Sequence, residues 1–251
     1  MGQPRPVSMR RTRIYSTELL NQVGQLVALD ENGSKHLVQV LRLKSDAEII
    51  LFDQRGEEFL AQLSVADKKA SQATLIEHLR SEKPAALHIT LAMGISRGER
   101  MDFSIQKAVE LGVSHFQPLF TERCMVQLKG DRQQSRSAHW QGVIRHACEQ
   151  SGRALLPTIE APTDLPNWLS TFTGNGLMLD HRAEHSLASL PAPAESLTLL
   201  VGPEGGLSEA ERNLALQHTF TAGRMGPRVL RTETAPLAAL AAIQTLWGDF
   251  R

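Results

Sequence analysis

Short apolar or alternating runs dominate the first eighty residues of the chain. Turn-forming residues at 31–33 and 54–56 separate them, and this punctuation is typical of β-strands. The predicted strands are LVAL (26–29), AEIILFD (47–53), EEFLAQLSV (57–65) and QATLIEHL (72–79). Leu37, Val40 and Leu41 fall at helical spacing, which predicts one short helix between the first two strands. Several short strands with one helix indicate a small β-barrel.

Beyond a linker at Ser81–Pro84, apolar runs of strand length alternate with amphipathic stretches of helix length. The predicted strands are 87–95, 115–120, 176–181 and 197–202, and the predicted helices are 100–113, 137–152 and 208–218. Ser208 and Glu211 have the spacing of a capping box. A last helix should begin near Thr234, because Pro236 is tolerated only in a first turn. The alternation predicts a parallel α/β sheet, and hence two domains, 1–82 and 83–251.

Composition narrows the class of protein. The 251 residues are 41% hydrophobic and 22% charged, which is ordinary for a globular protein of this size. The formal net charge is zero, so a nucleic-acid binder of this composition must concentrate its positive charge locally. Two isolated cysteines, no signal peptide and no apolar run of 18 residues indicate a reduced, cytoplasmic chain without a membrane span. None of the nine histidines has metal-ligand spacing, so no metal is expected.

The first candidate site is LLVGPEGGLSEAE (199–211), which runs from an apolar strand through a glycine-rich turn into a capped helix. Open α/β sheets bind ligands at the carboxyl ends of their strands, and glycines let backbone amides approach a ligand. The turn has neither the P-loop pattern nor GxGxxG. Taken alone, this segment is equally well explained as a tight turn in which the glycines serve only the backbone geometry.

Two further segments carry clustered charge. AGRMGPRVLRTETAP (222–236) places three arginines and Glu233 beside a glycine turn, where burial without partners would be costly. SRGERMDFSIQKAVELGV (96–113) places Arg97 and Arg100 after a strand, and Lys107 three residues before Glu110 on a helix. A surface ion pair between these last two is the simpler interpretation, and contact of Lys107 with RNA is the alternative.

Taken together, six segments resemble the RsmE family of ribosomal RNA small-subunit methyltransferases, which belong to the SPOUT superfamily. They are HLVQVLRL (36–43), SRGERMDFSIQKAVELGV (96–113), ERCMV (122–126), ACEQSGR (147–153), GPEGGLSEAE (202–211) and MGPRVLRTETAPLAAL (225–240). The resemblance covers nearly the whole chain in the expected order. Met225, where the family usually has leucine, and Pro236, at a small-residue position, depart from the pattern.

The resemblance implies an α/β protein with a PUA-like RNA-binding β-barrel followed by a SPOUT domain that contains a deep trefoil knot. It also implies S-adenosyl-L-methionine (SAM) as cofactor, N3 of a uridine in small-subunit (16S) ribosomal RNA as target, and a homodimer. SAM would bind against three loops. The residues that match those loops are Leu179, Asp180, His181, Val201, Gly202, Pro203, Glu204, Gly205, Gly206, Met225, Gly226, Val229, Leu230, Arg231, Thr232 and Thr234.

Arg231 and Glu233 are the catalytic candidates. A guanidinium stays protonated and could stabilise negative charge on the uracil carbonyl oxygens. Glu233 is a candidate base or orienting group. An ion pair with Arg231, or a carboxylate that serves the helix N-terminus, is an equally good interpretation of it.

RNA contact is expected from basic residues of both domains and from one histidine. The candidates are Arg10, Arg11, Arg13, His36, Arg42, Arg97, Arg100 and Lys107. A solvated basic tail is the alternative at the N-terminus. Two alternative functions remain at this stage, namely a SPOUT enzyme that methylates the ribose 2′-oxygen and a non-catalytic RNA-binding assembly factor. The intact GPEGG and RTET segments argue against the second.

Overall fold

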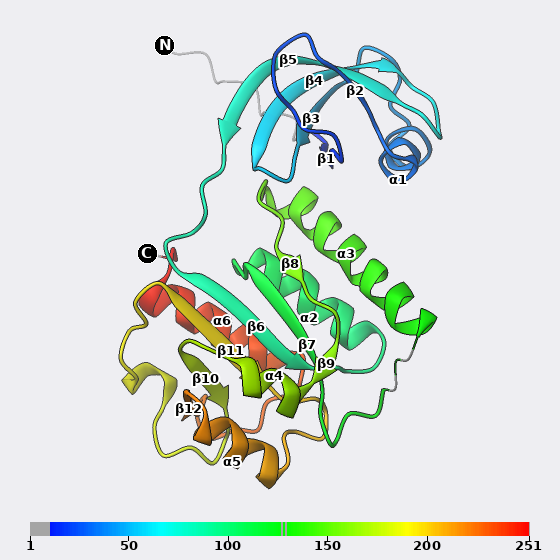
Figure 1. Cartoon of the computed structure of the whole chain (residues 1–251). Helices are drawn as coiled ribbons and strands as arrows, with labels where there is room; N and C mark the ends of the chain where they lie inside the picture. The colour runs from blue at the N-terminus through cyan, green and yellow to red at the C-terminus, as the bar shows by residue number, and fades with distance from the viewer. Residues whose placement is uncertain (1–10, 127, 129, 251) are drawn as a thin grey trace, which may run out of the picture. The chain divides into compact units, whose positions relative to one another are not determined.

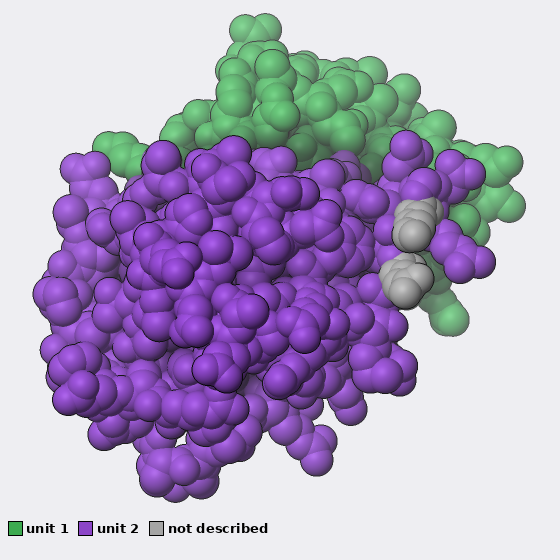
Figure 2. Space-filling model, turned by 60° about the horizontal axis from the view of Figure 1, so that its bottom comes forward, with its two compact units in different colours: residues 1–83, 148–156 green, residues 84–147, 157–251 purple. Residues whose placement is uncertain are grey.

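The computed structural model describes residues 11–126, 128 and 130–250, so the predicted RNA contact Arg10 lies outside the described residues. The chain divides into two compact units, coloured separately in Figure 2. Unit 1 runs up to Lys83 and also takes in Cys148–Leu156. Unit 2 comprises the segment Pro84–Ala147 and the chain from Pro157 onward. Within the described ranges, no helix is long and apolar enough to cross a membrane.

Unit 1 is built on a curled five-stranded sheet (Figure 1). In spatial order its strands are β1 (Arg13–Tyr15), β3 (Glu48–Phe52), β4 (Glu57–Val65), β5 (Gln72–Ser81) and β2 (Leu26–Ala28). The pair β1–β3 is parallel and the other three pairs are antiparallel. Apolar side chains of these strands enter one core, which includes the fully buried Ile49, Leu51, Leu63 and Leu75. Strict alternation is interrupted in β4, where irregularities in the register with β5 leave four consecutive residues buried.

The short helix of unit 1 begins earlier than the sequence predicted. Residues 31–33, interpreted as a turn, form the start of α1 (Glu31–Lys35), which continues into a single π-helical turn, η1 (His36–Val40). The side chain of Asp30 caps this start by accepting a hydrogen bond from Gly33 N at 2.7 Å. An Asp-Glu-Asn-Gly sequence suits a turn, but the capping bond makes it a helix N-terminus instead.

Unit 2 contains a seven-stranded parallel sheet. Its main path is β12 (Phe220–Gly223), β10 (Gly176–Leu179), β11 (Ser196–Val201), β6 (His88–Gly94), β7 (His115–Phe120) and β8 (Thr158–Ile159), with β9 (Thr163–Asp164) pairing β7 off that path. All of these pairs are parallel. The carboxyl ends of the strands therefore share one edge, where open α/β sheets bind ligands.

Helices cover both faces of this sheet (Figure 1). The helices α4 (Leu165–Thr171) and α5 (Glu209–Gln217) pack on one face through a core that includes Met178, Leu200 and Phe220. On the other face, α2 (Glu99–Glu110) contacts α6 (Thr234–Trp247). The long helix α3 (Asp131–Ser151) ends in residues that belong to unit 1.

The α/β class, with a curled N-terminal sheet ahead of a parallel sheet, is confirmed, and the trefoil knot stays a prediction. The last helix begins at Thr234 as expected. The capping box is also confirmed, because Ser208 accepts from Glu211 N at 3.3 Å while Glu211 accepts from Ser208 N at 2.8 Å. The helix predicted at 137–152 in fact begins at Asp131.

Candidate cofactor and RNA site

A cavity of about 550 Å³ lies at the carboxyl edge of the unit 2 sheet. Three segments form its walls: residues 179–182 after β10, residues 201–207 after β11, and residues 225–235 between β12 and α6. Its volume is in the usual range for small-molecule sites, and its lining mixes backbone, apolar side chains and a few charges. The three segments meet because their strands are parallel neighbours.

The glycine-rich turn after β11 is held closely against the neighbouring strand. A Cβ at Gly94 would lie 2.4 Å from Pro203 Cδ, and one at Gly202 would lie 2.8 Å from Leu207 N. Gly206 has φ +67°, a conformation that favours glycine, and a Cβ there would meet open space. Side chains are therefore excluded at the first two glycines by sterics and disfavoured at the third by backbone conformation.

The carboxylate of Glu204 joins this turn to the loop after β6. Its Oε1 accepts from Arg97 N at 3.0 Å and from Arg100 Nη1 at 3.2 Å. Burial alone would raise the pKa of Glu204, but these hydrogen bonds and the Arg100 charge outweigh it and hold the pKa below the ordinary value. Glu204 therefore remains ionised at neutral pH and holds Arg97 and Arg100 beside the cavity.

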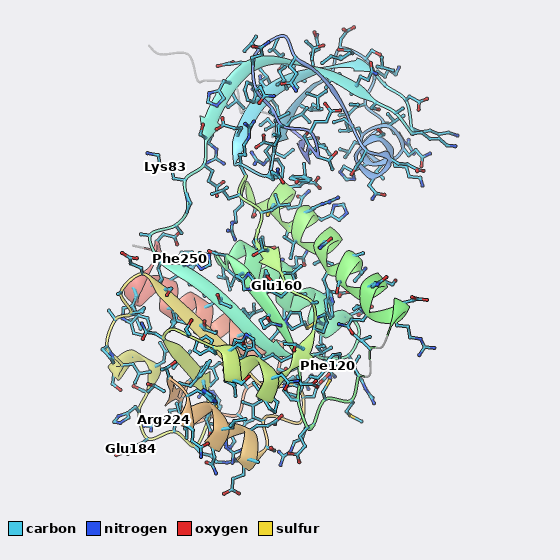
Figure 3. All side chains as sticks on the ribbon, viewed as in Figure 1. Lys83, Phe120, Glu160, Glu184, Arg224 and Phe250 are labelled. Carbon is cyan, nitrogen blue, oxygen red and sulfur yellow. The ribbon has the colours of Figure 1, made fainter. Side chains whose placement is uncertain are left out.

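Two further cross-links fix the cavity walls. Arg212 Nε lies 3.3 Å from Asp180 Oδ2, so α5 is ion-paired to the segment after β10. On another wall, Arg123 Nη1 donates to Gly205 O at 3.0 Å. Arg224 holds the base of the third segment by donating to the carbonyls of Ala183 and Glu184, and Figure 3 labels Arg224 and Glu184 close together.

Arg231 and Glu233 line the same cavity. Glu233 occupies the N-cap position of α6, yet its carboxylate makes no capping hydrogen bond. Across the described part of the chain, neither side chain has an ion pair or hydrogen bond. The alternative of a mutual ion pair is therefore not what the structure shows, and both groups remain available to a ligand.

Comparison with known proteins gives the family. Residues 82–244 match the family model for an RNA methyltransferase domain, and residues 29–76 match that for an RNA methyltransferase PUA domain. The ribosomal RNA small subunit methyltransferase E of Buchnera aphidicola (strain Sg) is 32% identical over 96% of this chain and 98% of its own length. The chain belongs to the ribosomal RNA small subunit methyltransferase E family.

Solved structures of relatives agree. A Neisseria gonorrhoeae ribosomal RNA small subunit methyltransferase E bound to SAM is 40% identical, with a TM-score of 0.88, over 96% of this chain and 100% of that one. A putative methyltransferase from Legionella pneumophila in complex with SAM is 35% identical, with a TM-score of 0.92 and the same coverages. The family resemblance seen in the six sequence motifs is therefore confirmed.

Most of the residues predicted to bind the cofactor line the one cavity. The lining includes Leu179, Asp180, His181, Val201, Gly202, Pro203, Glu204, Gly205, Gly206, Met225, Val229, Leu230, Arg231 and Thr232, whereas Gly226 and Thr234 stand outside it. The carboxylates of Asp180 and Glu204 are already engaged by Arg212 and Arg100. Both residues therefore have protein partners within the site, and their direct contact with the cofactor stays a prediction.

The RNA contacts predicted for unit 1 have mixed placements. The side chain of Arg13 is only 9% exposed and its guanidinium pairs with Glu58 at 2.7 Å, which favours a structural role, and its contact with RNA stays a prediction. Arg11 is exposed and pairs with Glu48. Arg42 is exposed on the loop after η1 with φ 55°, and His36 is half-buried with its own interactions. Arg11 and Arg42 thus keep solvent-facing guanidinium groups.

In unit 2, Arg100 in the first turn of α2 lines the cavity, and Arg97 lies in the loop that precedes this helix. Lys107 Nζ instead lies 2.7 Å from Glu110 Oε1, so the simpler interpretation, a surface ion pair, describes it. Four further arginines, to which the sequence analysis assigned no contact, also line the cavity, at positions 123, 182, 212 and 228. Arg123 belongs to the ERCMV motif and Arg228 to the arginine-rich loop, so both carried a signal.

Metal ligation has no candidate among the described residues, since no group of three or more His, Cys, Asp or Glu side chains is placed to hold an ion.

Proposed function

We propose that this chain transfers a methyl group from SAM to N3 of a uridine in small-subunit ribosomal RNA. The observation that carries the proposal is the cavity in which Arg231 and Glu233 stand unpaired beside the GPEGG turn. Relatives of 40% and 35% identity that cover nearly the whole chain are described as bound to SAM. The family name specifies small-subunit ribosomal RNA as the substrate class of the relatives.

The residues present fit the cofactor. The cavity volume suits a small molecule, and its lining offers close backbone approach at the glycines and apolar surface at Leu179, Val201, Met225 and Leu230. When bound, SAM supplies an electrophilic methyl group to a nucleophile held in line with it. The chain itself contributes the orientation, which is worth several kcal/mol in such displacements, on the order of 7–11 kcal/mol in the best cases.

Arg231 and Glu233 act on the base. Uridine N3 carries a proton, so the ring must lose that proton for the nitrogen lone pair to attack. Arg231 is proposed to stabilise the resulting charge on the flanking carbonyl oxygens, because its guanidinium remains protonated. Glu233 is proposed to accept the proton or to orient the base.

Mapping of methylated bases tests the reaction. Small ribosomal subunits and naked ribosomal RNA from cells lacking this protein are incubated with the pure chain and SAM, and nuclease digests are analysed by mass spectrometry. Methyluridine modified on the base at a single position is expected. Methyl groups on ribose would support the 2′-O alternative, and SAM binding without any methylation would support the assembly-factor alternative.

A variant tests the role of Arg231. Arg231→Ala should lower the single-turnover rate at saturating SAM and RNA by on the order of a hundred- to a thousandfold, as removal of one preorganised donor does. SAM affinity and the melting temperature should change little. Arg132→Ala, which removes an exposed arginine of α3 outside the cavity lining, is the matched control and should retain the rate. A near-normal rate in folded Arg231→Ala would exclude the proposed electrophile.

We also propose a homodimer that acts in the cytoplasm, where ribosomal RNA is made. Exposed apolar side chains on and after the α2–α6 layer support a second copy packing there, including Phe103, Leu246 and Phe250, the last labelled in Figure 3. Light scattering of the pure chain tests the oligomeric state, and a monomer at micromolar concentration would contradict it. We further propose residues 1–82 as the RNA-binding domain and 83–251 as the methyltransferase domain.

A further inference from the structure

Two hydroxyl groups link the loop after β6 to two segments of the cavity wall. Thr232 Oγ1 donates to the backbone oxygen of Gly202 at 3.1 Å, and Ser96 Oγ lies 3.3 Å from Thr232 Oγ1. Ser96 follows β6, Gly202 opens the GPEGG turn after β11, and Thr232 stands between Arg231 and Glu233. The sequence argument did not select Ser96, and it assigned Thr232 to cofactor contact.

The donor and acceptor in each of these two hydrogen bonds follow from the single proton that each hydroxyl carries. A carbonyl oxygen can only accept, so Thr232 must use its single hydroxyl proton on Gly202. Thr232 Oγ1 is then an acceptor toward Ser96, which must donate. The order is Ser96 to Thr232 to Gly202, and the Thr232 proton is no longer available to a ligand.

The arrangement fixes the backbone that carries the two catalytic candidates. Arg231 O accepts from Thr234 N at 2.9 Å and from Ala235 N at 2.8 Å, which anchors one side of the segment to the first turn of α6. The hydroxyl chain anchors the other side at the very next residue. Ser96 is only 3% exposed, so water offers its hydroxyl little compensation if the partner is lost.

We propose that Ser96 and Thr232 are positioning residues whose hydroxyl chain holds Arg231 and Glu233 at the cofactor loop. This inference rests on the proposed function and deepens it. SAM affinity distinguishes two roles of the Thr232 hydroxyl. Loss of a positioning hydroxyl leaves SAM affinity intact, whereas loss of a direct cofactor contact weakens it. Among the residues that the structure describes, the Ser96 hydroxyl hydrogen-bonds only to Thr232, so the contribution of this hydroxyl must pass through Thr232.

A series of variants tests whether the Ser96–Thr232–Gly202 hydrogen bonds position the catalytic candidates. Each variant is measured by single-turnover methylation at saturating SAM and RNA, by SAM calorimetry and by melting curves. Thr232→Val, which keeps the shape and removes the hydroxyl, should lower the rate by on the order of tenfold, as loss of a buried hydrogen bond does. Thr232→Ser should restore most of the rate. Ser96→Ala should fall between wild type and Thr232→Val, and the double variant should be no slower than Thr232→Val alone.

Ser104→Ala is the matched control, because Ser104 is a buried serine on α2 outside the cavity lining. It should leave the rate unchanged. A weaker SAM affinity in Thr232→Val with a normal saturated rate would overturn the positioning role, as would additive effects in the double variant. If wild type itself methylates no RNA, the proposed function fails, and a second measurement then decides the inference.

That second measurement is amide hydrogen exchange in the cofactor-free chain. Thr232→Val and Ser96→Ala should accelerate exchange at residues 231–235, and Thr232→Ser and Ser104→Ala should not. Unchanged exchange in Thr232→Val would show that the hydroxyl chain does not hold this segment, whatever the activity.

Discussion

Arg13 offers a direct test of the structure against the sequence-based expectation. Its guanidinium lies 2.7 Å from Glu58 Oε1, donates to Arg153 O at 3.2 Å, and stands 4.9 Å from the centre of the Phe52 ring. The side chains of Arg13 and Glu58 are 9% and 6% exposed. Arg13→Ala should therefore destabilise unit 1 and leave RNA affinity in the folded protein nearly unchanged.

The expected loss of unfolding free energy in Arg13→Ala follows from the burial of the Arg13–Glu58 ion pair. Removing one partner of a buried ion pair costs about 3–5 kcal/mol, because the other charge stays buried. Glu58 keeps a second partner in Arg80, whose Nε lies 3.1 Å from Glu58 Oε2, so the lower end applies. A loss of about 3 kcal/mol corresponds to a fall of roughly 6–12 °C in melting temperature for a chain of this size.

Thermal melts, together with RNA binding measured across a salt series, separate a structural role of Arg13 from contact with RNA. Arg11→Ala is the matched control, because the Arg11–Glu48 pair is about half exposed and should contribute less than about 1 kcal/mol. If Arg13→Ala melts like wild type while the salt dependence of RNA binding flattens by about one phosphate contact, the structural role is wrong and Arg13 contacts RNA.

Three further outcomes are expected. Gly202→Ala should abolish SAM binding in calorimetry, because the added Cβ would lie 2.8 Å from Leu207 N; normal affinity would contradict the tight turn. Burial raises the pKa of the Cys148 thiol to about 12, so at pH 8 only the half-buried Cys124 should react with a thiol reagent until the chain is unfolded. Rapid labelling of Cys148 in the native chain would contradict its burial. The folded-state pKa of Glu204 is depressed, so its stabilising contribution is present above the ordinary value of 4.5 and is lost as pH falls through the lower folded value. The difference in unfolding free energy between wild type and Glu204→Gln should thus be constant at neutral pH and shrink in acid, and a difference that grew in acid would have the wrong sign.

The sequence predicted elements well where one physical signal dominated. The strand 57–65 was predicted with the bounds of β4, because an apolar run of strand length follows the turn residues 54–56 there. Thr234 was predicted as the start of α6 because proline restricts where a helix can begin. The start of α1 was misjudged because residues 31–33 suit turns and helix N-termini equally, and only the Asp30 cap decides between them.

Site residues were predictable as a group but not by role. Strand order brings the three cofactor segments to one edge, and their glycine and arginine content marked them in the sequence. What each charge does depends on partners far along the chain, such as Glu204 with Arg100 or Arg13 with Glu58. No local pattern encodes those pairings, so Arg13 was assigned to RNA and Ser96 was not selected.

The charge around the cavity resolves the question posed by a net charge of zero. Six arginines line it, and acidic residues pair with two of them, since Asp180 engages Arg212 and Glu204 engages Arg100. The remaining four, at positions 123, 182, 228 and 231, have no ion pair among the residues that the structure describes. SAM is itself cationic at neutral pH, so such a surplus of positive charge is not suited to attracting the cofactor. Glu233 is the remaining acidic residue of the lining, so a net positive charge is left, and this suits a polyanion at the same mouth. We therefore propose that this local arginine surplus attracts RNA, which the total charge of the chain does not, beside the group proposed to act on the base.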